Sequence, residues 1–160
     1  EIVFELINIY HFTMRDCIRY YQSIGIVEDF ANTHYGYGFH EDKGRAMIKM
    51  FLLPLLLGIK IIDLKAYIDI INGNGYSKFI NSIKQIEIVR NGLKNYMAKD
   101  QEGNISDESY NKQLLEIYNA IFNHKVDSYR EYNNGVIELN MYSYNYMMEA
   151  LSLLKKGLKY

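Results

Sequence analysis

The most apolar stretch of this chain runs from Ala46 to Ile62 and reads AMIKMFLLPLLLGIKII. Lys49 and Lys60 bracket an uncharged centre, which is about half as long as the roughly 20 residues that cross a bilayer. We therefore expect no transmembrane span, but a helix buried on most sides with other helices packed around it. Pro54, the only proline of the chain, removes one backbone hydrogen bond, so we expect a kink there.

The central stretch also predicts where the core lies. We expect Leu53, Leu56 and Leu57 to be largely buried, because they lie in the middle of this helix. Nothing in the stretch indicates chemistry of its own. The stretch therefore predicts a core and contributes nothing to an active site.

Helical spacing of apolar residues recurs along the rest of the chain. Thr13 and Asp16 have the spacing of a capping box, and they predict a helix that ends at Gly25. Asp63 and Ser106 are placed to cap two further helices, over 64–71 and up to 122. The spacing also predicts one long helix over 76–98 and a last helix over about 136–158.

The sequence therefore predicts an all-α fold, an irregular bundle of roughly six to eight helices around the central helix 46–62. A length of 160 residues fits a single helical domain, 1–160. Residues 34–44 contain three glycines, so we expect a surface loop there.

Charge and cysteine content exclude several classes of function. The formal net charge is −1, which argues against a nucleic-acid partner, since such binding needs a clustered excess of Lys and Arg. Cys17 is the only cysteine and cannot form an internal disulfide, so we expect a reducing, cytoplasmic location. Its place on the apolar face of a helix predicts a buried structural thiol. Because the chain starts at Glu1 and not at Met, we interpret it as a fragment of a larger protein.

Residues 34–44 hold the candidates for a phosphate or metal site. The segment GFHEDKG, 38–44, reverses the Gly-Lys order of a phosphate-binding loop and lacks its Ser or Thr. The loop holds four residues that can bind a metal: His34, His40, Glu41 and Asp42. Their spacing matches no standard metal site. We therefore predict no metal and no catalytic residue in this chain.

Two segments resemble a known family. FTMRDCIRYYQSI, 12–24, opens a helix with a hydroxyl residue, an apolar residue and Arg-Asp. FLLPLLLGIKIIDLKAYIDII, 51–71, is an apolar helix ending in Ile-Lys-Ile, followed by a short Asp-capped helix with Tyr67. This layout is similar to the helical region after the nucleotide-binding core of KAP-family P-loop NTPases. The resemblance covers about residues 1–72 and does not extend to 76–160.

The resemblance implies a non-catalytic role for this chain. It would be the helical C-terminal lid, or regulatory part, of a P-loop NTPase whose nucleotide-binding motifs lie upstream of Glu1. The full-length protein would then use ATP and magnesium, while this chain alone would hold no cofactor. Arg15 is the nucleotide-sensing candidate, because an arginine there could reach phosphate held by the missing core. The alternative for Arg15 is an ion pair with a carboxylate elsewhere in the chain.

Two other classes of function stay open. One is a free-standing helical protein-interaction module, such as an adaptor or an immunity-type protein. The other is a small-molecule enzyme or a ligand-binding bundle. The partner is accordingly either the missing NTPase core or another protein, and no feature of the sequence predicts the oligomeric state.

Overall fold

The computed structural model describes residues 2–35, 42–123 and 131–157, and their side chains except for 31–35 and 154–157. Counting the continuous run from α3 to α4 as one, this part of the chain holds eight helices, so the predicted all-α multi-helix class is confirmed. The elements in order are α1 (Ile2–Tyr10), α2 (Met14–Tyr35), α3 (Lys43–Met47), the π-helical turn η2 (Ile48–Leu52), α4 (Leu53–Ile62), α5 (Leu64–Ile71), α6 (Tyr76–Gln85), α7 (Glu87–Leu93), the 3-10 turn η3 (Lys94–Tyr96), α8 (Asp107–Phe122), β1 (Tyr132–Asn133), β2 (Glu138–Leu139) and α9 (Met141–Gly157).

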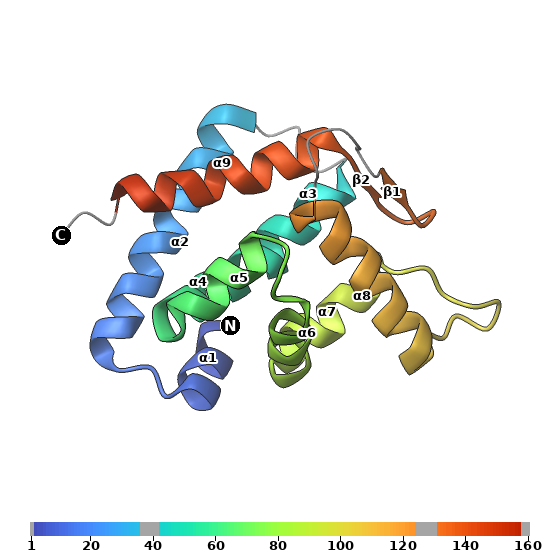
Figure 1. Ribbon diagram of the computed structural model, residues 1–160, viewed down its shortest axis with the longest axis horizontal. Helices are drawn as coiled ribbons and strands as arrows, with labels where there is room; N and C mark the ends of the chain where they lie inside the picture. Colours follow the sequence, from blue (N-terminus) through green and yellow to red (C-terminus); the bar gives the residue numbers. More distant parts are fainter. Residues whose placement is uncertain (1, 36–41, 124–130, 158–160) are drawn as a thin grey trace.

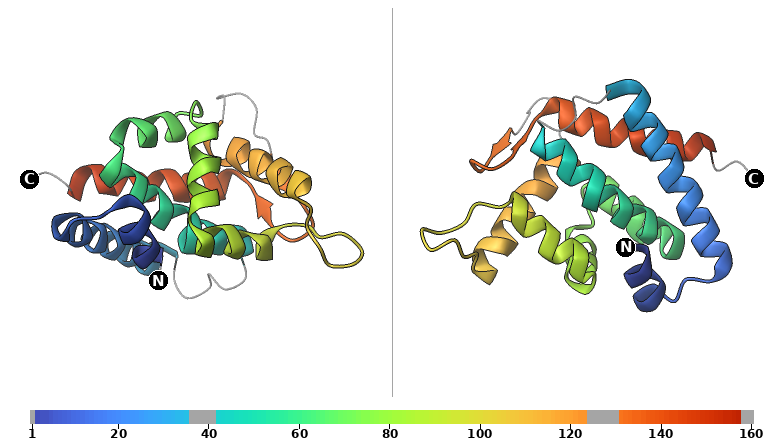
Figure 2. Two further views of the ribbon diagram at one scale, coloured as in Figure 1. Left: turned by 90° about the horizontal axis from the view of Figure 1, so that it is seen from below. Right: turned by 180° about the vertical axis from the view of Figure 1, so that it is seen from behind.

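The central apolar helix has the position that its sequence predicts. α4 contacts α1, α2, α5 and α6, and α9 crosses α2 on the side away from α1 (Figure 1). Leu53, Leu56 and Leu57 are buried, as expected. α6, α7 and α8 form the opposite half of the bundle, and Figure 2 shows that α2 and α8 lie at opposite ends of the molecule.

The distortion expected at Pro54 takes the form of a π turn. The N–H of Leu53 donates to the carbonyl of Ile48, five residues earlier, and Pro54 follows in the first turn of α4. A proline ring in a regular helix collides with the carbonyl four residues before it. A wider π turn immediately upstream gives that ring room, so the helix continues past the proline.

The helix that begins after Thr13 is longer than predicted. We expected it to end at Gly25, but α2 continues to Tyr35. Val27 and Phe30 extend the buried face beyond Gly25, and this packing outweighs the weak helix propensity of one glycine. The expected loop over 34–44 is therefore shorter at both ends, since α3 starts at Lys43, while 36–41 lie outside the described residues.

The predicted helix over 76–98 is interrupted at Ile86, and this correction has a tertiary cause. Ile86 is buried in an extended conformation, with φ −95° and ψ 100°, between α6 and α7. The carboxylate of Glu5 in α1 accepts a hydrogen bond from the N–H of Ile88, at 3.1 Å. The guanidinium of Arg90 donates to the carbonyl of Lys84, at 2.8 Å. Both bonds satisfy backbone groups that the interruption leaves without a helical partner.

The last helix starts later than predicted, because a short hairpin comes first. Tyr132 pairs with Leu139 in the two-stranded antiparallel sheet of β1 and β2. Gly135 has a φ of 84° in the connection, a value that favours glycine. The side-chain oxygen of Asn134 accepts hydrogen bonds from the N–H groups of Val136 and Ile137. Local polar chemistry therefore makes a turn where apolar spacing alone predicts a helix.

Candidate functional site

The predicted helix start at Thr13 is confirmed. The Asp16 N–H donates to the Thr13 hydroxyl at 3.2 Å, and the Thr13 N–H donates to the Asp16 carboxylate at 2.9 Å. The Thr13 hydroxyl also donates to this carboxylate, at 2.7 Å. These hydrogen bonds lower the pKa of Asp16, with smaller contributions from Arg19 and Arg15. These reciprocal hydrogen bonds form the predicted capping box, which fixes where α2 begins.

α2 forms one wall of an open groove with a volume of about 800 Å³, and α4 with the start of α5 forms the other. The α2 wall consists of Met14, Arg15, Ile18, Arg19, Gln22 and Ser23. The opposite wall consists of Leu57, Lys60, Ile61 and Leu64. The α2 wall follows the i, i+3, i+4, i+7 spacing of one helix face, while the opposite wall combines three residues of α4 with Leu64 of α5. We call this feature the basic groove.

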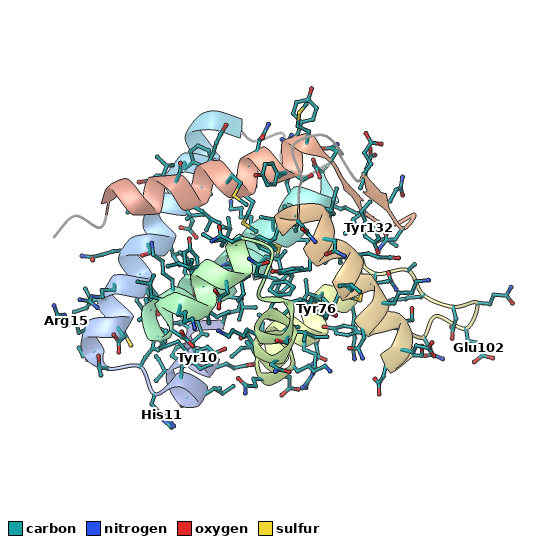
Figure 3. All side chains as sticks on the ribbon, viewed as in Figure 1. Tyr10, His11, Arg15, Tyr76, Glu102 and Tyr132 are labelled. Carbon is teal, nitrogen blue, oxygen red and sulfur yellow. The ribbon has the colours of Figure 1, made fainter. Side chains whose placement is uncertain are left out.

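Arg15 lies at the outer rim of the basic groove. Its side chain is exposed, and Figure 3 shows it near the start of α2, directed away from the bundle. In the part of the chain that the structure describes, no carboxylate forms an ion pair with Arg15. The simple alternative for this residue, an ion pair within the chain, is therefore not observed among the described residues.

Two cations that sequence reasoning did not single out share the groove with Arg15. Arg19 lies one turn further along α2 and is also exposed. Lys60 lies on the opposite wall, with its ammonium 5.4 Å from the centre of the Tyr67 ring. All three charged side chains that line the groove are basic. The four-residue spacing of Arg15 and Arg19 already predicts that these two side chains lie on one face of a helix. No local feature of the sequence predicts that Lys60 lies near them.

The groove also presents apolar surface. The side chains of Met14, Ile18 and Leu64 are 78%, 53% and 55% exposed, and Ile61 lies partly buried between the walls. The hydroxyl of Ser23 donates to the carbonyl of Arg19, at 2.9 Å, so it is engaged in its own helix. The lining residues thus combine positive charge with apolar contact area. This set is suited to binding and holds no acid–base pair.

Of the four candidate metal ligands in 34–44, only Asp42 has its side chain among the described residues. Asp42 caps α3 by accepting from the Arg45 N–H at 3.0 Å, and its carboxylate lies 3.2 Å from the Arg45 guanidinium. The side chains of His34, His40 and Glu41 lie outside the described residues. Where side chains are described, no group of three His, Cys, Asp or Glu could hold a metal. Cys17 packs against the core as a half-buried thiol, so it is less buried than expected.

No family model, curated protein or solved structure matches this chain. None of the helices described is both long enough and apolar enough to cross a bilayer.

Proposed function

We propose that this chain is the helical regulatory part of a P-loop NTPase, without catalytic activity of its own. Arg15 is the residue that would contact nucleotide phosphate held by the core of that protein. The observation that supports this proposal is the setting of Arg15. It is an exposed cation in the first turn of a long, box-capped helix, and no described carboxylate pairs with it.

The local energetics favour a role outside this chain. A cation in the first turn of a helix faces the positive end of the helix dipole, which costs about 0.3–1 kcal/mol. Thr13 and Asp16 already complete the cap by hydrogen bonds, and Arg15 makes only the smallest electrostatic contribution to the Asp16 carboxylate. A planar guanidinium binds phosphate oxygens with two parallel hydrogen bonds and stays charged at any physiological pH. Phosphate bound by Arg15 would therefore offset the local cost.

α2 is well placed to transmit such contact into the bundle. It packs against both α4 and α9, and its Tyr20, Val27 and Phe30 are buried. A helix anchored over this length moves as a rigid body more readily than it bends. A change in phosphate occupancy at Arg15 would then shift α2 against the central helix.

The coding sequence upstream of Glu1 provides the test. The proposal predicts a GxxxxGK[ST] motif within a few hundred residues of Glu1, joined in frame to this chain. The purified chain alone should neither bind ATP tightly nor hydrolyse it. An upstream sequence without such a motif, or ATP hydrolysis by this chain itself, would contradict the proposal.

The second candidate is a free-standing helical interaction module, and the apolar side chains of the basic groove favour it. Met14, Ile18 and Leu64 expose contact area that phosphate binding does not use. This candidate predicts that the chain works without any nucleotide-binding domain. The same upstream sequence therefore separates the two candidates.

A further inference from the structure

We infer that the basic groove is a docking site for an acidic amphipathic helix of a partner protein. This inference does not depend on the proposed contact between Arg15 and nucleotide. It follows from three properties of the groove, namely the spacing of its walls, its exposed apolar side chains and its charge.

The shape of the groove suits one face of a helix. At 1.5 Å per residue, the α2 lining from Met14 to Ser23 extends over roughly 13 Å, and the α4 lining from Leu57 to Ile61 over roughly 6 Å, with Leu64 of α5 continuing that wall. The α2 wall matches about two and a half turns of a helix lying between the walls. A volume of about 800 Å³ accepts several apolar side chains from one helical stripe, while the rest of that helix remains in solvent.

The apolar side chains supply the contact area for such a helix. Ile18 from α2 and Ile61 from α4 face the same space, with Met14 and Leu64 exposed at its edges. An apolar stripe with i, i+3, i+4, i+7 spacing on the partner could bury all four at once. The two strands that the structure describes, β1 and β2, lie between α8 and α9, so the groove offers no described strand edge for a partner strand.

Charge determines which helix fits. Arg15, Arg19 and Lys60 line the groove, and none of its lining residues is acidic. Acidic side chains that flank the apolar stripe of a partner would meet these cations on both walls. A basic helix would be repelled by them. Three cations on a chain of net charge −1 are too few for a nucleic-acid surface, so the charge favours an acidic protein segment.

The test is a selection from displayed helical peptides, using the 160-residue chain as bait. Peptides of about 16 residues allow about four turns of helix. The Ile18→Asp/Arg19→Glu double variant serves as the counter-selection. Because both side chains are exposed, this variant should keep its circular dichroism spectrum and melting temperature. We expect enriched peptides that combine an apolar stripe at helical spacing with flanking Glu or Asp.

The strongest enriched peptide is then titrated by fluorescence anisotropy against single variants. Ile18→Asp should weaken binding at least about tenfold, because it places a carboxylate among the apolar side chains of the groove. Arg19→Glu should weaken binding about threefold or more, and added salt should reduce this difference. Lys112→Glu is the matched control. Lys112 is an exposed cation on α8, at the far end of the bundle, so this variant should bind like the unaltered chain.

Three results would overturn the inference: no enrichment over the double variant, enrichment of basic peptides, or binding that Ile18→Asp leaves unchanged. None of these readouts involves nucleotide. A failed selection would therefore leave the proposed NTPase role intact, and a missing upstream phosphate-binding motif would leave the groove inference intact.

Discussion

Removing the hydroxyl of Tyr118 should destabilise the chain by a calculable amount. This hydroxyl is buried between two backbone groups, donating to the carbonyl of Ile70 at 2.9 Å and accepting from the N–H of Gly75 at 3.0 Å. In Tyr118→Phe the Ile70 carbonyl keeps a second donor, the N–H of Gly73 at 3.1 Å. The buried N–H of Gly75 has no other bond in the described part of the chain. The expected loss is therefore that of one unsatisfied buried group, about 1–3 kcal/mol.

Urea unfolding followed by circular dichroism measures this loss. The ring of Tyr118 should keep its contacts with Phe79 and Phe122, so the midpoint should fall while the slope stays constant. Tyr142→Phe is the control, because Tyr142 is 61% exposed and its loss of a hydroxyl should change stability by less than about 0.5 kcal/mol. Equal midpoints for Tyr118→Phe and the control would show that the hydroxyl does not hold the α5–α6 turn.

Three further predictions concern the core, the cap and alkaline pH. Leu56→Ala should cost about 2–5 kcal/mol in reversible denaturation, since Leu56 is fully buried, and a loss below about 1 kcal/mol would contradict a core role for α4. Thr13→Ala should cost about 1 kcal/mol and raise the pKa of Asp16 through loss of the hydroxyl donor, and an unchanged Asp16 titration by NMR would show that the Thr13 hydroxyl does not bond to this carboxylate. Burial raises the pKa of Tyr67 and Tyr110 from 10.0 to about 12, so the folded chain keeps these protons at higher pH than the unfolded chain does. Stability should therefore fall as the pH rises from about 10 to about 12 in urea unfolding, and a constant midpoint over that range would refute the burial argument.

Features encoded within a few residues could be predicted from the sequence. The caps at Thr13, Asp63 and Ser106 all form as expected, with Asp63 accepting from the Ala66 N–H and Ser106 from the Ser109 N–H. Each depends on a side chain and a backbone group three residues apart. The burial of the central leucines was equally predictable, because no other stretch is as apolar.

Features set by distant residues could not be predicted. The interruption at Ile86 depends on Glu5, which contacts α7 across a separation of 83 residues. The hairpin of β1 and β2 is held by Asn134, whose amide donates to the Tyr96 carbonyl and to the side chain of Gln113. Helical periodicity reports the burial of a face and not the partners of backbone groups, so both the break at Ile86 and the second strand of the hairpin fall where the spacing predicts helix.

In the candidate site, too, one feature could be predicted from the sequence and another could not. Arg15 could be singled out from its place in the first turn of a predicted helix. The groove could not, because Lys60 comes to face Arg15 and Arg19 only when α2 packs along α4. The apolar residues of α5 show the same limit. Leu64 and Ile68 are large apolar residues four positions apart, yet the structure exposes both and buries the smaller Ala66.

ATP turnover by the full-length protein tests the central proposal most directly, with Arg15→Ala compared with the unaltered protein. If Arg15 contacts phosphate, turnover per folded molecule should fall at least about tenfold, a loss of about 1.4 kcal/mol in transition-state stabilisation. The melting temperature of the isolated 160-residue chain should stay within a few degrees, because no described carboxylate pairs with this side chain. Unchanged turnover together with a loss of several kcal/mol in the stability of the chain would show that Arg15 is structural and that the proposal is wrong.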